Sequence, residues 1–299
     1  MQNHPHPLTE PLLTKSFWSA DYVPTLDAML SRTLARIALK KEQGLRTPDE
    51  LWIVDHNDVY TLGQAGKEEH ILQRTNTPII KTDRGGQVTW HGHGQLVIYW
   101  LFDLESLGWS VRNMVSHAEQ AIEDVVNDCL KSHASNSVNT SADISAHARR
   151  DAPGVYLYSH LNTASNENAQ SLSNAPADDA IMLGKIASLG FKIKHGFSYH
   201  GVAINLDCDL SAFNAINPCG YAGMQMLRLA DFVAMDEQTQ DEQTQDEQTQ
   251  DEQLAVQAAE QSMQAIANCL SYEQVTQKLI DNIAKRHAGH IQLRALAPK

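Results

Sequence analysis

The chain has 299 residues, enough to bury a sizeable core, and 42% of them are apolar, which is typical of a folded globular protein. Its 36 Asp and Glu outnumber its 23 Lys and Arg, and the net charge of -13 argues against nucleic acid as a partner, because phosphate binding requires a basic face. The repeat Asp236–Glu252 carries eight of these acidic residues, so the remainder is only mildly acidic and a local basic patch could still receive an acidic protein.

Membrane insertion and secretion find no support in the sequence. No run approaches about 18 consecutive apolar residues, so we expect no transmembrane helix and no membrane partner. The N-terminal stretch has no basic segment followed by an apolar one, so we expect no signal peptide. The cysteines Cys129, Cys208, Cys219 and Cys269 show no Cys-x-x-Cys spacing, which favours free thiols in a cytoplasmic protein over a disulfide framework.

The N-terminal half predicts one helix and several short strands. Residues 1–16 are rich in proline and histidine and predict a disordered tail, and a helical period then runs from Thr25 to a stop at Gly44. Short apolar runs predict strands at 51–54, 59–63 and 78–81, and a longer one at 95–102. The segment 83–94 has four glycines around a strand-like Gln-Val-Thr-Trp, which indicates a close approach of the backbone to a ligand.

The middle of the chain returns to a helical period. Residues 109–130 predict an amphipathic helix with Ser110 as its N-cap. The segments 131–152 and 159–180 are rich in Ser, Asn, Ala and Asp, and we expect long surface insertions there, with a strand at 153–158 between them. Strand-like sequence then covers 182–206 with a turn at Gly190, and 224–229 predicts a last strand.

The last part of the chain begins with a repeat. The pentapeptide Asp-Glu-Gln-Thr-Gln recurs over 236–253 without an apolar residue, which predicts a solvated linker, and helical patterns follow at 254–270 and 272–287. Strands and helices are interspersed without regular βαβ repetition. The sequence therefore predicts an α+β (mixed α/β) fold, a single domain of residues 17–235 and 254–290 around a mixed sheet flanked by helices.

Two residues carry the most distinctive chemistry, Cys219 and Lys185. Proline and glycine flank Cys219 and place it on a sharply shaped loop, where nucleophiles often lie. The thiolate is the reactive form, and the ordinary pKa of a thiol is about 8.5, so a nearby ammonium such as that of Lys185 would activate it. The residues alone leave open whether Cys219 is reactive or a small buried apolar residue, and whether Lys185 transfers protons or faces solvent from a half-buried strand.

Other constellations are less specific. Arg84–His91 could cradle a phosphate or carboxylate, since Arg binds such groups bidentately, but it matches neither a Walker loop nor a dinucleotide fingerprint. His91 and His93 with Cys219 are a weak zinc signal, because no fourth ligand is evident, and we expect no metal or cofactor. A Ser–His–Asp triad lacks its Gly-x-Ser-x-Gly motif, and Ser188 is better interpreted as part of a pocket wall.

Taken together, five motifs in order make the chain resemble the lipoyl(octanoyl) transferase family of the biotin/lipoate protein ligase superfamily. The motifs are Leu62–Gly66, Arg84–Gly92, Gly184–Gly190, His200–Asn205 and Asn217–Tyr221, within roughly 51–103 and 153–229. The resemblance implies a fold like the catalytic domain of biotin and lipoate protein ligases. It also implies octanoyl transfer from octanoyl-acyl carrier protein to lipoyl domains of 2-oxoacid dehydrogenases and the glycine cleavage H protein.

The resemblance also assigns roles to residues. It implies that Cys219 is the acyl-accepting thiol and that Lys185 tunes it. The residues that match the family's acyl-pocket lining are Arg84, Gly85, Gly86, Gln87, Val88, Thr89, Trp90, His91, Ser188, Leu189, Gly190, Gly201, Val202 and Ala203. The family commonly has proline where His93 stands. An ATP-dependent lipoate or biotin ligase of the same fold, and a non-catalytic module that binds an acyl carrier, are the alternatives.

Overall fold

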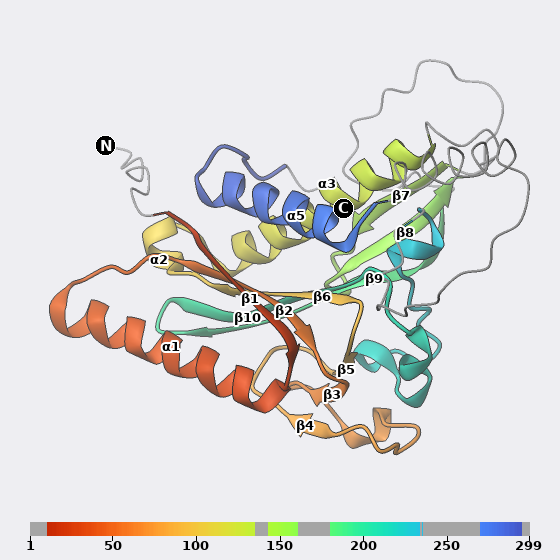
Figure 1. Ribbon diagram of the computed structural model, residues 1–299, viewed down its shortest axis with the longest axis horizontal. Coiled ribbons are helices and arrows are strands. Elements are labelled where there is room, and N and C mark those ends of the chain that lie inside the picture. The colour runs from red at the N-terminus through yellow and green to blue at the C-terminus, as the bar shows by residue number, and fades with distance from the viewer. Residues whose placement is uncertain (1–10, 135–142, 161–179, 234, 236–269, 295–299) are drawn as a thin grey trace, which may run out of the picture.

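The computed structural model describes residues 11–134, 143–160, 180–233, 235 and 270–294. Its centre is a seven-stranded sheet with the strand order β1-β2-β6-β10-β9-β8-β7 (Figure 1). The strands are β1 (Leu13–Ala20), β2 (Glu50–His56), β6 (Gln95–Leu101), β7 (Asp143–Ala148), β8 (Val155–His160), β9 (Ile181–Lys194) and β10 (Phe197–Asn205). β1 is parallel to β2 and the other neighbouring pairs are antiparallel, so the sheet is mixed, as predicted.

A small second sheet lies beyond one end of the main sheet (Figure 1). Its strands are β3 (Val59–Leu62), β4 (Ile79–Lys81) and β5 (Val88–His91), in the order β4-β3-β5. The 3-10 helices of the described chain are η1 (Glu68–His70), η2 (Leu210–Ala215), η3 (Pro218–Gly220) and η4 (Leu229–Asp231). The glycine-rich segment that the sequence singled out enters β5, so this sheet brings it toward the main one.

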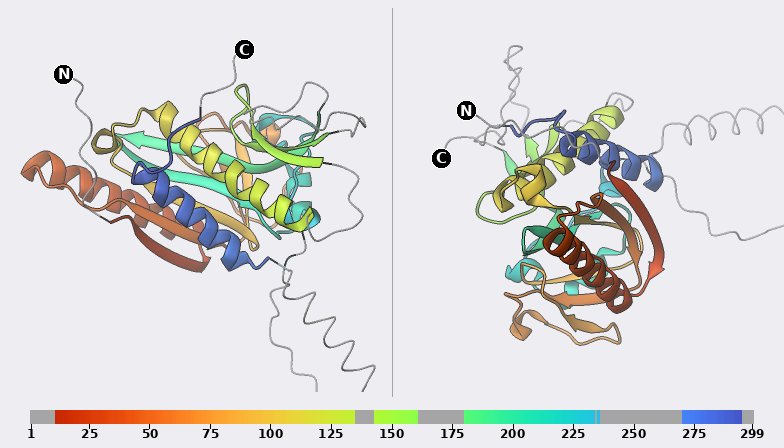
Figure 2. Two further views of the ribbon diagram at one scale, coloured as in Figure 1. Left: turned by 90° about the horizontal axis from the view of Figure 1, so that it is seen from above. Right: turned by 90° about the vertical axis from the view of Figure 1, so that its left-hand side faces the viewer.

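Helices cover both faces of the main sheet. α1 (Tyr22–Gln43) lies on one face, α3 (Val111–Ala134) and α5 (Tyr272–His287) lie side by side on the other, and α2 (Leu104–Leu107) is a single turn (Figures 1 and 2). In β2, Leu51 and Ile53 join the core beneath α3 and α5, whereas Trp52 and Val54 pack with Met29 of α1. Successive side chains point to opposite faces of a sheet. A strand that is covered on both faces therefore has apolar residues at every position, as residues 51–54 do.

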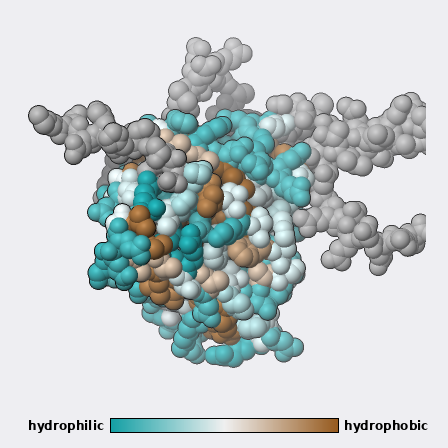
Figure 3. Space-filling model, turned by 60° about the vertical axis from the view of Figure 1, so that its left-hand side comes forward, coloured by the Kyte–Doolittle hydropathy of each residue, from teal (hydrophilic) through white to brown (hydrophobic). Residues whose placement is uncertain are grey.

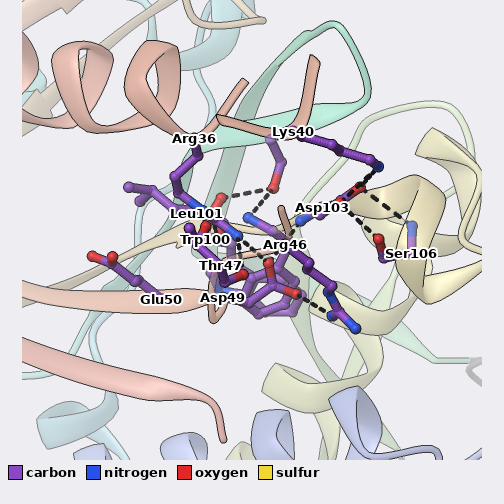
Figure 4. A network of polar contacts seen from close by, with 12 residues as sticks. Arg36, Lys40, Arg46, Thr47, Asp49, Glu50, Trp100, Leu101, Asp103 and Ser106 are labelled. Carbon is purple, nitrogen blue, oxygen red and sulfur yellow. Dashed lines mark hydrogen bonds and ion pairs between the residues drawn. The ribbon is translucent and has the colours of Figure 1, made fainter. Parts of the chain in front are cut away.

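A buried polar cluster around Asp49 joins the first and last helices to the sheet. Figure 4 shows the part of it that involves Arg36 and Asp103. Asp49, just before β2, accepts a 2.5 Å hydrogen bond from Arg36 of α1 and a 2.8 Å bond from the backbone of Asp103. His287 of α5 lies 2.8 Å from its other carboxylate oxygen. Burial alone would raise the pKa of Asp49, but the hydrogen bond from His287 and the charge of Arg36 hold it below its usual range. Asp49 therefore stays ionised and ties three elements together.

Several predicted elements are confirmed. The helices at α1, α3 and α5 and the strands at β2, β3, β4, β5, β6 and β8 all form, with boundaries that differ by a few residues. Gly44 ends α1 in the left-handed conformation. Ser110 caps α3, because its hydroxyl accepts the Asn113 N–H at 3.1 Å.

Other predictions are wrong. Leu13–Ser16 belong to β1 rather than to a disordered tail, and 143–148 form β7 inside a predicted insertion. Both are outer strands of the sheet. β1 lacks the apolar alternation that reveals a half-buried strand, whereas β7 alternates at Ile144, Ala146 and Ala148 but lies within a stretch rich in Ser, Asn and Ala. Residues 224–229 form no strand, and their pairing with β9 is an isolated bridge between Met226 and Lys185. The predicted helix at 254–270, apart from Leu270, and the repeat at 236–253 lie outside the described residues.

Gly190 does not make the predicted turn. It pairs with Gly201 inside the β9–β10 hairpin, whose turn is at His195 and Gly196. A Cβ at Gly190 would lie 3.0 Å from the carbonyl oxygen of Gly85. The glycine therefore serves close approach of the glycine-rich segment to the main sheet, which is the other common reason for a glycine within a strand.

The surface is mixed in character. On the face drawn in Figure 3, apolar patches are interrupted by hydrophilic residues. No helix in the described part of the chain combines the length and the apolar character needed to cross a bilayer.

Candidate active site

The structure brings Lys185 and Cys219 together. The Lys185 ammonium donates a hydrogen bond to the Cys219 sulfur at an Nζ–Sγ distance of 3.0 Å. Lys185 comes from β9, and Cys219 from the turn η3 beside the small sheet. The turn is anchored where the Asn217 N–H donates to the His70 carbonyl at 2.8 Å. Cys219 has a φ of +58°, a left-handed conformation that non-glycine residues seldom adopt and that is concentrated at functional sites.

Lys185 is buried, not solvent-facing. Its side chain is 2% exposed, and its ammonium also donates to the Pro153 carbonyl at 2.9 Å and lies 5.3 Å from the centre of the Tyr156 ring. Within the described chain, its hydrogen-bond acceptors are thus a carbonyl and the thiol, and no carboxylate pairs with it. The Cys219 sulfur is therefore the side-chain acceptor of this buried ammonium within the described residues.

A cavity of about 430 Å³ opens beside this pair. Both Lys185 and Cys219 line it, and apolar atoms make up most of its wall. The other lining residues that the sequence predicted are Arg84, Gly85, Gly86, Gln87, Val88, Thr89, His91, Ser188, Leu189, Gly190, Gly201, Val202 and Ala203. Trp90 is the exception, since it belongs to the apolar cluster of the small sheet and its ring packs edge-on against Phe213 with centroids 5.5 Å apart.

Arg84 shapes the glycine-rich wall of the cavity. Its buried guanidinium donates to the carbonyls of Thr61, Gly85 and Gln87 at 2.7 to 2.8 Å and to the Thr61 hydroxyl. Gly63 is required here, because a Cβ would come within 2.4 Å of the Gly86 oxygen. Most donors of Arg84 therefore hold the loop in shape, which speaks against the predicted role as a cradle for phosphate or carboxylate.

Known proteins identify the family. A family model described as the lipoyl protein ligase A/B catalytic domain matches residues 27–251. The chain belongs to the lipoyl protein ligase A/B catalytic-domain family. It is 72% identical to an octanoyltransferase of Psychrobacter arcticus over 98% of this chain and 96% of that one. The octanoyltransferase of Psychrobacter cryohalolentis is also 72% identical, over 99% and 97%. That of Acinetobacter baylyi is 47% identical over 62% of this chain and 68% of the relative.

The two histidines of the glycine-rich segment, His91 and His93, do not point toward a common position in this lipoyl ligase-family site. Nδ1 of His91 lies 2.7 Å from Gln95, and burial lowers the pKa of His91 to about 3, so the ring is neutral. The side chain of His93 is 59% exposed outside the cavity and lies 2.7 Å from Asp55. In the ranges that the structure describes, no group of three or more His, Cys, Asp or Glu side chains is placed to hold a metal ion.

His200 is a cavity residue that sequence reasoning quoted within a motif but did not assign to the site. Its Nε2 lies 2.9 Å from Asp83, and Tyr199 donates to the other oxygen of that carboxylate. The hydrogen bond with His200 has the largest effect, and together with that from Tyr199 it lowers the pKa of Asp83 to about 2, although burial acts in the opposite direction. His200 has a φ of +60°, and its Nδ1 is buried without a hydrogen-bond partner in the described chain.

Further lining residues also escaped prediction. They are Tyr22, Val97, Tyr99, Val111, Val115, Ala152, Pro153, Phe191, Ile193 and Tyr221. Val111 and Val115 are four residues apart on α3, and this spacing was interpreted as a face of the core. Tyr22 begins α1, and no local pattern indicates that it reaches a cavity whose other lining residues lie between 84 and 221. Only the lipoyl ligase-family fold brings these residues together.

Proposed function

We propose that the chain is an octanoyltransferase that carries the octanoyl group as a thioester on Cys219. The donor is octanoyl-acyl carrier protein, and the acceptor is a lysine of a lipoyl domain, as in 2-oxoacid dehydrogenases and the glycine cleavage H protein. The 72% identical relatives are named octanoyltransferases. The observation that carries the covalent step is the 3.0 Å contact between a buried ammonium and the thiol of Cys219 at the cavity wall.

The first half-reaction loads the enzyme. The Cys219 thiolate attacks the thioester carbonyl of the carrier, and the bond between the acyl carbon and the carrier sulfur breaks. The carrier sulfur leaves with its electron pair and takes a proton from the Lys185 ammonium. One thioester replaces another, so the step is close to neutral in free energy and requires no ATP.

The second half-reaction unloads the enzyme. The neutral amine of the acceptor lysine attacks the acyl carbon on Cys219 and passes its proton to the now neutral Lys185. The bond to the Cys219 sulfur breaks, and the thiolate returns beside an ammonium. The dyad is thus restored without another base, and the reaction runs downhill because an amide replaces a thioester.

The apolar cavity supplies the affinity for the acyl chain. Burying the methylenes of an octanoyl group contributes on the order of 5 kcal/mol, at about 0.8 kcal/mol per methylene. This is enough to favour medium chains over acetyl, but it separates neighbouring chain lengths poorly. We place the protein in the cytoplasm, where thiols stay reduced.

Transfer measured without ATP tests the proposal. Purified chain is incubated with octanoyl-carrier protein and a lipoyl domain, and the octanoylated domain is measured by mass. The parent is expected to transfer, Cys219→Ala to be inactive, and Cys208→Ala to remain active, because Cys208 is a buried core thiol whose pKa burial raises to about 12. A requirement for ATP together with survival of Cys219→Ala would instead identify a ligase. Binding of the carrier without transfer would identify a non-catalytic module.

A further inference from the structure

The turn before β8 fixes the position of the Lys185 ammonium. Pro153 provides the carbonyl that accepts a hydrogen bond from Nζ at 2.9 Å. Gly154, the next residue, has a φ of +141°, which L side chains rarely adopt. A Cβ at Gly154 would lie 2.5 Å from Cε and 2.8 Å from Nζ of Lys185. The turn therefore supplies both an acceptor for the ammonium and the space that the lysine side chain occupies.

A carboxyl group on α3 holds this turn. The Gly154 N–H donates to Oε1 of Glu119 at 3.2 Å, and Glu119 is 8% exposed on a helix face that otherwise packs against the sheet. Burying a carboxyl group is costly unless it forms hydrogen bonds, so its presence on this face requires a reason. Burial raises the pKa of Glu119 to about 7, while the Gly154 N–H and the charge of Lys185 act in the opposite direction.

We propose that Glu119 is a positioning residue for the acyl-transfer site, which holds the Pro153–Gly154 turn so that Lys185 points at Cys219. The connection runs from Glu119 Oε1 to the Gly154 N–H, and from the adjacent Pro153 carbonyl to the ammonium. The ammonium then reaches the sulfur. The inference rests on the proposed function in one respect, namely that Lys185 activates Cys219.

The same helix contains a matched control. Glu123, four residues after Glu119, accepts the Ala148 N–H at 2.5 Å with its Oε1 and is also buried. Its partner is the last residue of β7, and no recorded contact joins that residue to Lys185 in the described chain. Loss of Glu123 therefore removes a similar helix-to-backbone hydrogen bond, together with a 2.6 Å ion pair with Arg294, without touching the turn that holds the ammonium.

The rate at which iodoacetamide alkylates Cys219, followed by peptide mass mapping at one pH, tests the inference. Glu119→Leu is expected to slow alkylation about tenfold. This is the size of effect that the loss of one buried hydrogen bond would have if that bond keeps the ammonium beside the sulfur. Glu119→Gln keeps an acceptor oxygen and is expected to restore the rate to within about twofold of the parent. Glu123→Leu is expected to leave the rate within about twofold even where it lowers the melting temperature as much as Glu119→Leu.

Three outcomes would overturn the inference: an unchanged rate in Glu119→Leu, an equal loss in both leucine variants, or no rescue by glutamine. Should Glu119→Leu not fold, Glu119→Asp withdraws the carboxyl by one methylene, and its expected result is a slower rate than that of Glu119→Gln. Lys185→Met separates this inference from the proposed function. If Lys185→Met slows alkylation and Glu119→Leu does not, only the positioning role is lost. If Lys185→Met has no effect, the dyad and this inference are both overturned.

Discussion

Nζ of Lys185 lies 3.0 Å from Sγ of Cys219, although 34 positions separate the two residues in the chain. The contact forms because β9 runs through the main sheet while the turn η3 packs beside the small sheet. A contact between a strand of the main sheet and a turn beside the small sheet depends on the whole fold, so its consequences can be tested at some distance from the sulfur as well as at it.

Replacing the ammonium should slow the chemistry more than it weakens binding. Lys185→Met keeps a long apolar side chain but removes the charge and the proton, and we expect kcat/KM for transfer to fall by about 10² to 10⁴. Lys194→Met, at the exposed end of the same strand, is the control and should transfer normally. Steady-state rates with octanoyl-carrier protein give the comparison, and comparable activity in the two variants would exclude a role for Lys185 in proton transfer.

Much of the site, but less of the fold, could be predicted from the sequence. Cys219 and Lys185 stand in glycine-punctuated motifs, so local chemistry singles them out before any fold is known. β1 was missed because a strand at the outside of a sheet needs no apolar alternation, and β7 because its alternation at Ile144, Ala146 and Ala148 is short and rests mostly on alanine. Gly190 was taken for a turn because sequence alone does not separate a glycine that turns the chain from one that lets another backbone approach.

Residues that reach the cavity from distant elements could not have been predicted. Tyr22 and Val115 belong to helices whose apolar period is explained equally well by the core. His200 is set apart by a positive φ and an unpartnered buried nitrogen, which are properties of the folded backbone. Glu119 lies at the edge of the apolar face of α3, and only its contact with Gly154 reveals a use for the carboxyl group.

The Asp83–His200 contact should make stability depend on pH. The folded pKa of Asp83, about 2, lies below the ordinary value of 3.8, so its contribution is present above about pH 4 and is lost as pH falls through about 2. Asp83→Asn is therefore expected to lower the urea midpoint at pH 7, with a difference from the parent that shrinks between about pH 4 and pH 2. Asp27→Asn, at an exposed position of α1, is the control. A difference that stays constant over this range would show that the Asp83 carboxylate is not stabilised by folding.

The buried cluster around Asp49 should dominate the polar contribution to stability. Asp49→Ala leaves the buried guanidinium of Arg36 without its carboxylate, and we expect a loss of about 3 to 5 kcal/mol of unfolding free energy. Asp128→Ala, which removes the surface ion pair with Lys278, should cost about 0 to 1 kcal/mol. Denaturant unfolding measures both values, and equal losses would contradict the importance assigned to the cluster.

The intact mass of the protein after incubation with octanoyl-carrier protein, with no ATP and no acceptor present, tests the central claim most directly. We predict that the parent gains one octanoyl group, that peptide mapping places it on Cys219, and that adding a lipoyl domain removes it. Transfer to the lipoyl domain at the normal rate without any such mass gain, or an equal gain in Cys219→Ala, would contradict the thioester on Cys219.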